Sequence, residues 1–489
     1  MFWRGVLGYL PVNIVQGVVG VLTLVIFTRV LSPDQYGAYA LAFSAMSLAH
    51  TAVFTWLQAA MARFFAAEEV KGELPDHFTT LYRLWFVLAA LFALVGAAAL
   101  AFWPMPVALK LALGAGLACA LVQSVLKMAQ EHRRAAGKVS AAAMIDIVQI
   151  AGGFAVGAAL ALLGMGGGAP LAGAAGAAAV CLTWALPSEV RQLKGGRFRM
   201  DLVRRYAAYG YPVALSLILA LVLSTTDRVL LSIYADQATV GVYHAGYSLA
   251  NRTLDVMFVW FGMAAGPAAI RAFERGGRAA LDVAAREQAS FMVLLTLPAA
   301  VGVSLVASPL VEVMVGENLR QGAALATRWV VLSGFFSGVT TYYFHTAFTL
   351  GKRTTLMFVA MAIPAGLNVV LNFLLVPRFG LQGALWATAI SYGVGMLASI
   401  GLGRRAMPLP IPWNTLGRAG IAAAAMATAV LLVPAFGGVL ELAVKAAVGG
   451  LVYGIVVMAL DAGHARTLAV QLLQTRRLRL VSGADKINT

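Results

Sequence analysis

Polar and charged side chains recur on one face of a long apolar segment. His244, Ser248, Asn251, Arg252 and Asp255 follow at offsets of 0, 4, 7, 8 and 11, which is the spacing of one face of an α-helix. A charge near the centre of a bilayer is costly, so this face must meet a water-filled cavity or another polar group. We predict that His244, Asn251, Arg252 and Asp255 line such a cavity and are candidate substrate-binding residues. The alternative is that Arg252 and Asp255 only neutralise each other.

Further charges lie in or near the ends of predicted membrane helices. Arg29 and the pair Asp227 and Arg228 occur on the side of the membrane that otherwise carries few basic residues. Because they recur at equivalent positions of an internal repeat, we predict that they line the same cavity and bind substrate. The alternative for an arginine there is that it only reaches the far lipid headgroups. Asp146 has no partner nearby in the sequence and is our candidate for a proton or cation site.

The motifs of enzymes and of nucleotide-driven pumps are missing from the sequence. No His, Cys and carboxylate residues cluster at metal-ligand spacing, and the glycine-rich run 164–170 lacks the Gly-Lys-Ser/Thr ending of a phosphate-binding loop. Cys119 and Cys181 fall within apolar segments, so they indicate neither a disulfide framework nor a metal site. We expect no catalytic residue, no cofactor and no metal.

The elements that position these side chains are membrane-spanning helices. Hydrophobic residues make up 61% of the 489 residues and charged ones 11%, against roughly 25% charged residues in an ordinary soluble domain. A helix that crosses a bilayer needs about 20 mostly apolar residues. The sequence predicts an all-α polytopic membrane protein with about fourteen such helices. They cover residues 6–28, 39–62, 82–103, 107–128, 140–163, 169–187, 209–233, 240–265, 289–308, 326–349, 356–376, 381–402, 418–436 and 440–461.

Basic residues divide the connections between these helices into two classes. Of the 36 Lys and Arg residues, 27 fall in or beside every second gap, seven fall in or beside the other gaps, and Lys127 and Arg252 are assigned to the helices themselves. Basic loops remain on the cytoplasmic side, so we predict a multi-pass protein of the bacterial inner membrane with both termini in the cytoplasm. This division also accounts for the net charge of +16 without nucleic acid as a partner. Lys127, near the inner end of its helix, is expected to reach the cytoplasmic headgroups.

An internal repeat appears when the chain is compared with itself at a shift of 204 residues. The matches are Gly37 with Gly241, Tyr39 with Tyr243, Ser44 with Ser248, Phe54 with Phe258 and Trp56 with Trp260. Six predicted helices separate the copies, so both have the same orientation and can enclose a central cavity. We predict an N-terminal six-helix lobe over 1–190, a basic cytoplasmic linker over 191–208, a C-terminal six-helix lobe over 209–403, helices 13 and 14 over 404–461, and a basic cytoplasmic tail over 462–489.

The two predicted lobes differ in their polar residues. The second helix carries hydroxyl groups on its polar stripe but no arginine, so the cavity is asymmetric unless Arg29 supplies a charge. In the C-terminal lobe, Pro364 is followed by Asn368 and Asn372 and predicts a kink in the eleventh helix.

Two short patterns resemble those of a known family. The pattern R-x-L-S-x-x-x-Y-G-x-Y is formed by Arg29, Leu31, Ser32, Tyr36, Gly37 and Tyr39, and the pattern D-R…V-G-x-Y by Asp227, Arg228, Val240, Gly241 and Tyr243. With the predicted helices, they make the chain resemble the bacterial polysaccharide flippases, the Wzx-like branch of the multidrug/oligosaccharidyl-lipid/polysaccharide exporter superfamily. The resemblance implies ion-coupled movement of undecaprenyl-pyrophosphate-linked oligosaccharide from the cytoplasmic to the periplasmic leaflet, by alternating access of the two lobes. Membrane lipids, a polysaccharide polymerase and chain-length or export proteins are the expected partners.

Three other functions remain open at this stage. A lipid II flippase also handles a sugar linked to a pyrophosphate. A multidrug exporter of the same superfamily would be expected to have an acidic cavity, which Arg252, Arg29 and Arg228 argue against. A membrane oligosaccharide polymerase or glycosyltransferase would be expected to have a sizeable soluble loop or domain, and the predicted loops are short.

Overall fold

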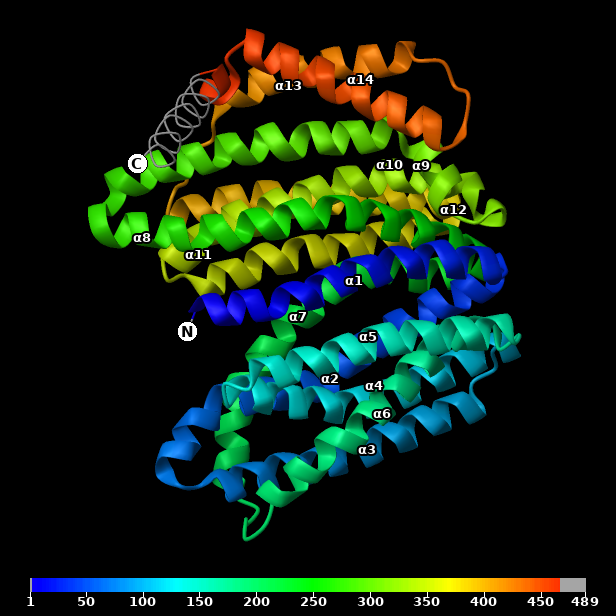
Figure 1. Cartoon of the computed structure of the whole chain (residues 1–489), viewed down its shortest axis with the longest axis vertical. Coiled ribbons are helices and arrows are strands. Elements are labelled where there is room, and N and C mark those ends of the chain that lie inside the picture. Colours follow the sequence, from blue (N-terminus) through cyan, green and yellow to red (C-terminus); the bar gives the residue numbers. More distant parts are fainter. Residues whose placement is uncertain (1, 467–489) are drawn as a thin grey trace, which may run out of the picture. The chain divides into compact units, whose positions relative to one another are not determined.

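The described part of the chain is almost entirely helical, with short irregular connections between the helices. The computed structural model describes residues 2–466, and that range contains helices and no strand, which confirms the all-α prediction. Residues 467–489 of the predicted basic tail lie outside the described residues. In chain order (Figure 1) the elements are α1 (Phe2–Val30), α2 (Pro33–Lys71), α3 (Leu74–Phe102), α4 (Val107–Ala135), α5 (Val139–Leu162), η1 (Gly166–Gly168), α6 (Ala169–Gln192), α7 (Met200–Tyr234), α8 (Gln237–Leu305), α9 (Ala307–Met314), α10 (Glu317–Val339), the short π-helix η2 (Thr340–Phe344), α11 (His345–Leu350), α12 (Thr354–Ala406), α13 (Trp413–Leu432), α14 (Gly438–Ala459) and η3 (Ala462–His464).

Twelve helices in the described range are long and apolar enough to cross a membrane. Two of them, α8 with 69 residues and α12 with 53, are far longer than the roughly 20 residues that a bilayer needs. Each contains one glycine with non-helical backbone angles, Gly277 in α8 at φ 61° and Gly380 in α12 at φ 53°. Each therefore consists of two helical segments, which match two predicted helices apiece. At Pro364, where the sequence predicts a kink, α12 keeps helical backbone angles.

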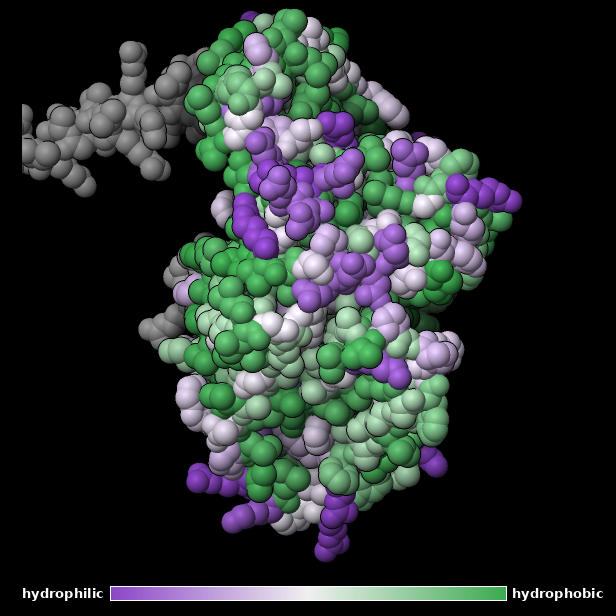
Figure 2. All heavy atoms as spheres, turned by 90° about the vertical axis from the view of Figure 1, so that its right-hand side faces the viewer, coloured by the Kyte–Doolittle hydropathy of each residue, from purple (hydrophilic) through white to green (hydrophobic). Residues whose placement is uncertain are grey.

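Large apolar side chains cover the outside of many helices. Figure 2 shows hydrophobic residues over much of the face in view, with hydrophilic residues gathered in separate patches. Leu94 of α3 and Trp413 of α13 are each 69% exposed, and Leu451 of α14 is 64% exposed. A soluble protein rarely exposes so many large apolar groups, so these surfaces face lipid.

The chain divides into two compact units. Unit 1 comprises residues 1–248, 314–326 and 364–391, and the rest of the chain forms unit 2. Unit 1 thus contains α1–α7, the N-terminal repeat among them, with residues 237–248 of α8, 317–326 of α10 and 364–391 of α12.

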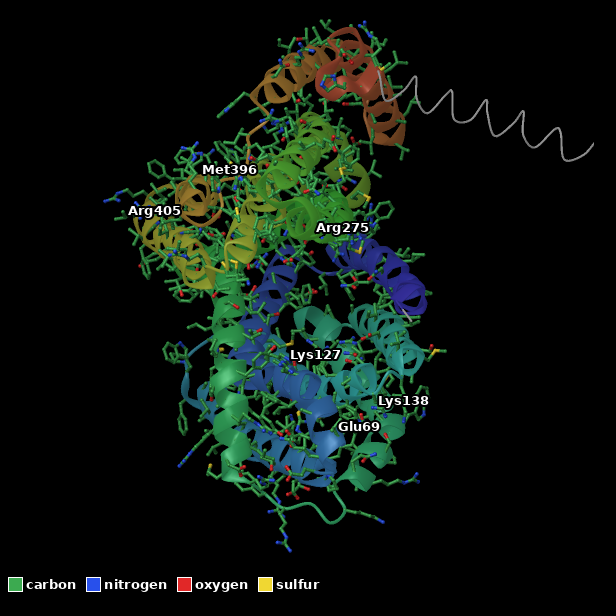
Figure 3. The ribbon with its side chains drawn as sticks, turned by 90° about the vertical axis from the view of Figure 1, so that its left-hand side faces the viewer. Glu69, Lys127, Lys138, Arg275, Met396 and Arg405 are labelled. Atoms are coloured by element: carbon green, nitrogen blue, oxygen red, sulfur yellow. The ribbon has the colours of Figure 1, made fainter. Side chains whose placement is uncertain are left out.

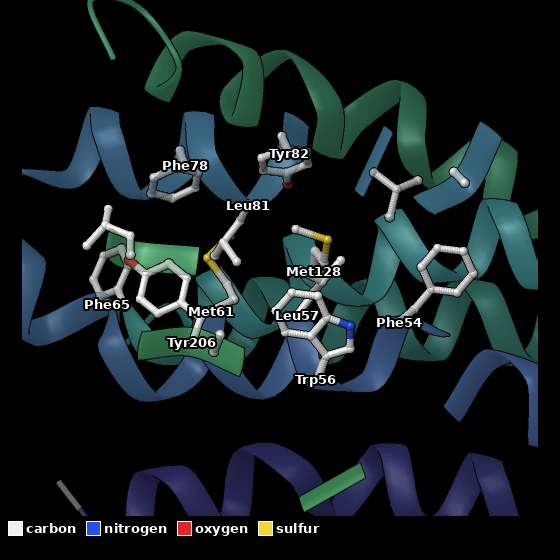
Figure 4. Close-up of a cluster of buried hydrophobic side chains, with 14 of the residues drawn as sticks. Phe54, Trp56, Leu57, Met61, Phe65, Phe78, Leu81, Tyr82, Met128 and Tyr206 are labelled. Carbon is white, nitrogen blue, oxygen red and sulfur yellow. The ribbon is translucent and has the colours of Figure 1, made fainter. Parts of the chain in front are cut away.

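The start of α7 packs on the N-terminal repeat. The helix begins at Met200, so part of the predicted linker is helical. Tyr206 belongs to a buried apolar cluster with side chains of α2, α3 and α4 (Figure 4). One turn further on, Tyr211 stacks on Trp56 with ring centroids 5.0 Å apart, and a β-carbon at Gly210 would lie 2.7 Å from the Trp56 carbonyl oxygen. The first half of α7 is therefore held by α2, while its second half carries Asp227.

Buried charges at the predicted cytoplasmic end of the N-terminal repeat neutralise one another. Glu189 of α6 is fully buried, forms an ion pair of 2.9 Å with Arg133 and lies 2.9 Å from Nδ1 of His132, both on α4. Tyr82 of α3 donates its hydroxyl to the same carboxylate at 3.0 Å. Because every group in this cluster is paired, we assign it to holding three helices together.

Candidate ion and substrate sites

A buried carboxylate lies at the centre of one polar cluster in unit 1. Asp227 of α7 is 0% exposed and accepts hydrogen bonds from α8 and α12. Its Oδ2 accepts from the hydroxyl of Tyr243 and, at 2.7 Å, from that of Thr388. Its Oδ1 accepts from the amides of Asn372 at 2.6 Å and Asn368 at 3.3 Å. Four neutral donors surround the carboxylate, and no basic residue of the described range forms an ion pair with it. A buried charge of this kind calls for a cation or a proton.

The same cluster holds buried oxygens that are not used. The Oδ1 atoms of Asn368 and Asn372 have no hydrogen-bond partner among the described residues, and neither does the hydroxyl of Ser391, three residues after Thr388. If the side-chain amide of either asparagine were rotated by 180°, its oxygen would point at the Asp227 carboxylate. Two such oxygens face each other favourably only when a cation lies between them. Carboxylate, amide and hydroxyl oxygens are the ligands of hard cations. Residues 2–466 contain no cluster of three His, Cys, Asp or Glu side chains, and a single carboxylate suits a monovalent cation or a proton.

Arg228, the next residue, contacts the N-terminal repeat. Its Nη1 donates to Ser44 Oγ of α2 at 3.2 Å and to the carbonyl oxygen of Ser224 at 2.9 Å. The guanidinium lies over the ring of Tyr247, 4.5 Å from the centroid. Asp227 therefore belongs to the polar cluster, and the next residue of α7, Arg228, belongs to the contact between the repeats.

The two repeats meet at the pair of glycines that the 204-residue shift matches. A β-carbon at Gly37, near the start of α2, would overlap the carbonyl oxygen of Gln237 at the start of α8. A β-carbon at Gly241 would lie 2.6 Å from the Pro33 carbonyl oxygen and 3.1 Å from the Gly37 nitrogen. The two helix starts thus cross without side chains between them, which glycine permits. The predicted periplasmic ends of the repeats are closed on each other at this point.

Two more predicted site residues lie at this end of unit 1. The imidazole of His244 is buried between Tyr36 and Tyr39, with ring centroids 5.5 and 5.9 Å away. Arg29 donates to the carbonyl oxygen of Met314 at 3.4 Å. Arg29, Arg228 and His244 therefore belong to the packed contact between the repeats, whereas the hydrogen-bond partners of Asp227 all lie on α8 and α12.

The rest of the predicted stripe belongs to unit 2. Arg252 and Asp255 are exposed on α8, three residues apart, and Asn251 is half-buried. Tyr342, from the π-helix η2, lies beside this segment: its ring stacks on Phe258 with centroids 5.9 Å apart, and it lies within the electrostatic reach of Asp255. Such π-helical insertions often occur at functional sites. Exposed charges of both signs beside a tyrosine suit a ligand with phosphate and hydroxyl groups.

Asp146, the predicted ion site, is already engaged. Its carboxylate pairs with Arg134 of α4 at 2.9 Å and accepts from the Gln130 amide at 2.9 Å. Arg134 also pairs with Glu131. We therefore prefer Asp227, which lacks such a basic partner, as the ion site.

Sequence reasoning did not assign several of these residues to a site. Tyr243, Thr388, Asn368 and Asn372 complete the cluster around Asp227, and Tyr342 joins the exposed charges of α8. The available signal was the pair of asparagines four residues apart on an otherwise apolar helix, which places both amides on one helix face.

These elements define a multi-pass helical membrane protein with the fold of flippases and multidrug transporters. The chain belongs to the family described as polysaccharide biosynthesis protein, whose pattern matches residues 26–322. This family assignment confirms the resemblance to the Wzx-like branch. A comparison with curated proteins gives no match.

Solved structures share this fold at low sequence identity. The lipid II flippase MurJ in an inward closed conformation aligns with a TM-score of 0.74 and 14% identity, over 92% of this chain and 98% of that chain. An inward-facing multidrug resistance MATE family transporter aligns with a TM-score of 0.58 and 14% identity, over 81% and 94%. The MATE multidrug transporter DinF-BH gives 0.53 and 15%, over 81% and 92%. These likenesses show the fold alone.

Proposed function

We propose that this protein is a secondary transporter that moves undecaprenyl-pyrophosphate-linked oligosaccharide from the cytoplasmic to the periplasmic leaflet of the bacterial inner membrane. The family supports a role in the synthesis of cell-surface polysaccharide. The observation that carries transport is the cluster around Asp227, a buried carboxylate with unused amide oxygens and no ion-pair partner among the described residues. Such a site can take up and release a coupling ion.

The coupling ion, a monovalent cation or a proton, acts through the adjacent arginine. An ion bound at Asp227 neutralises the carboxylate, and the side-chain amide oxygens of Asn368 and Asn372 turn toward the bound ion. Arg228 is fixed to the same turn of α7 and donates to Ser44 of the N-terminal repeat at 3.2 Å. Occupancy of the ion site thus changes the stability of the contact that closes the periplasmic side, which is the requirement for alternating access.

The substrate is recognised by polar groups of both charges. The guanidinium of Arg252 can bind two oxygens of the pyrophosphate or of an acidic sugar, and Asn251, Asp255 and Tyr342 offer partners for sugar hydroxyl groups. A lipid II flippase is the second candidate, because MurJ aligns with 98% of its chain and the same groups would suit its sugar-linked pyrophosphate. The exposed Arg252 is less suited to cationic drugs.

Topology and domain organisation complete the proposal. We place both termini and the 191–208 linker in the cytoplasm, where the excess of basic residues belongs. The six-helix lobes over 1–190 and 209–403 are the moving parts, helices 13 and 14 over 404–461 are accessory, and a polysaccharide polymerase with chain-length or export proteins receives the product.

The proposal distinguishes a transporter from a membrane enzyme by the mass of the substrate. Purified protein in liposomes should leave the mass of a lipid-linked oligosaccharide unchanged, because the described residues offer an ion site and binding groups but no cluster with metal-ligand chemistry. Mass spectrometry of the extracted lipid is the measurement. A longer glycan, or free polyprenyl pyrophosphate, would show instead that the protein is a polymerase or a glycosyltransferase.

The role of Arg252 is separated from simple charge neutralisation by a double mutant. If Arg252 binds substrate, Arg252→Ala should insert and fold normally but lower export by about tenfold or more, as expected for the loss of a charged hydrogen bond. Removing Asp255 as well should not restore export. Arg271→Ala, also exposed on α8, is the matched control and should export normally. If the double mutant Arg252→Ala, Asp255→Ala recovers both protein level and export, the pair is structural and the binding role is wrong.

A further inference from the structure

One cationic side chain of the N-terminal repeat takes no part in the sites described above. Lys127 lies on α4, eight residues and thus about 12 Å before the helix ends at Ala135. Its side chain is exposed, and Figure 3 places it among the helices of unit 1. Of the residues in the described range, none forms a hydrogen bond or an ion pair with its ammonium group. A charge within a membrane protein needs water, a partner or a ligand.

The carboxylates nearest to Lys127 are bound by another residue. Asp146 and Glu131 both act on Lys127 electrostatically, but Arg134 forms an ion pair with each of them. His50 of α2 and the Cys119 thiol of α4 are the other ionisable groups that interact with Lys127, and neither is bound to one of these carboxylates. The charges of Lys127, Arg134, Asp146 and Glu131 therefore sum to zero. The ammonium group of Lys127 can still donate its hydrogen bonds to a ligand.

An apolar pocket lies further along α4, and its lining ends one helical turn before Lys127. Cys119 and Gln123 precede Lys127 at intervals of four residues, so all three lie on one face of the helix. Both line a cavity of about 220 Å³, the space of about seven waters at ~30 Å³ each. Most of the other walls are apolar and include Phe27, Phe43, Met46, Ile150 and Phe154. Lys127 thus follows the lining residue Gln123 by about one turn on the same face of α4, and most of the walls beyond Gln123 are hydrocarbon.

We propose that this recess binds the diphosphate of a polyprenyl-linked substrate, with Lys127 on the phosphate oxygens and the pocket around the apolar atoms next to them. The ammonium offers three donors to an anion, and the apolar walls favour a phosphate attached to a hydrocarbon over free phosphate. The inference rests on the proposed function and deepens it. It gives the N-terminal repeat the charge that the hydroxyl-rich stripe of the second helix lacks.

The test compares ligand binding by purified full-length variants. Lys127→Gln should weaken the Kd for a short-chain polyprenyl diphosphate by about tenfold or more, and Lys127→Arg, which keeps the charge, should stay within about threefold of wild type. Lys110→Gln, at the start of the same helix, is the matched control and should bind as wild type does. The Tm of Lys127→Gln should not fall, because it removes a charge without a hydrogen-bonded partner in the described structure. Wild type should bind inorganic pyrophosphate at least about tenfold more weakly, because it lacks the apolar group.

Three results would overturn the inference. Equal affinity of wild type and Lys127→Gln for the polyprenyl diphosphate would show that Lys127 only reaches the lipid headgroups. An equal loss of affinity for phosphatidylglycerol vesicles would assign the site to bulk lipid, and equal binding of inorganic pyrophosphate would contradict the role of the pocket. A different result would contradict the proposed function and leave this inference standing: wild-type protein that binds the polyprenyl diphosphate through Lys127 but moves no lipid-linked oligosaccharide.

Discussion

Asp227→Asn should abolish the dependence of transport on an ion gradient. The substitution keeps the size of the side chain but removes the charge that a cation or proton would neutralise. Coupling free energies of 1–3 kcal/mol correspond to about 5-fold to 150-fold in affinity, so the stimulation of transport by a sodium or pH gradient should fall from at least about fivefold to none. The measurement is the initial rate of transport in liposomes, with and without the gradient.

The thermal stability of the purified protein is a second, independent test of the proposed ion site at Asp227. A ligand that binds only the folded state stabilises it, by about 2.7 kcal/mol at 100 times its Kd. Wild type should therefore show a Tm that depends on sodium concentration or on pH, and Asp227→Asn should show none. Asp236→Asn is the matched control, since Asp236 is exposed and caps α8 nearby, and it should keep both responses. An unchanged ion response in Asp227→Asn would assign coupling elsewhere.

Gly37→Ala should prevent the two repeats from closing at the ends that we propose to lie on the periplasmic side. The added β-carbon overlaps the carbonyl oxygen of Gln237, a backbone atom that cannot turn aside. A transporter that cannot close one side cannot complete its cycle, so transport should fall at least about tenfold while the protein still folds, because the outward-open state has no such contact. Gly17→Ala in α1, where a β-carbon has open space, should transport normally.

Accessibility of Ser44 tests this mechanism directly. Ser44 is 2% exposed and is covered by Arg228 in the closed contact. In a variant with Ser44→Cys, a membrane-impermeant thiol reagent added outside should label position 44 faster when Gly37→Ala is also present. The native Cys119 and Cys181 are buried and should contribute little. Equal labelling rates with and without Gly37→Ala would contradict the assignment of these glycines to the periplasmic contact.

The sequence predicts the helices well because apolar length and basic loops depend on local composition. The all-α architecture follows from runs of about 20 apolar residues, and the breaks within α8 and α12 lie between predicted helices. Even the match of Gly37 with Gly241 anticipates a contact, since residues near a pseudo-two-fold axis meet their own repeat equivalents.

The sites are harder to predict because they join residues that are distant in the sequence. Asp227 is more than 140 residues from Asn372 and 161 from Thr388, and single-sequence spacing carries no sign of such pairs. Asp146 is a different case, because its partner Arg134 lies only 12 residues earlier, and spacing alone does not show that the turn between α4 and α5 brings the two side chains together. Spacing also does not reveal that side chains on one face of α8 differ in exposure. His244 is buried between two aromatic rings, whereas Arg252 is exposed.

Movement of the substrate between leaflets is the central claim, and one reconstitution tests it. Liposomes that contain the purified protein and a fluorescent undecaprenyl-pyrophosphate-linked oligosaccharide are given an ion gradient, and a reagent that quenches only the outer leaflet follows the label. We predict that the protein moves the label between leaflets at least about tenfold faster than empty liposomes do, and that Asp227→Asn removes the effect of the gradient. If folded wild-type protein moves the label no faster than empty liposomes under any gradient, the protein is not a flippase for this substrate.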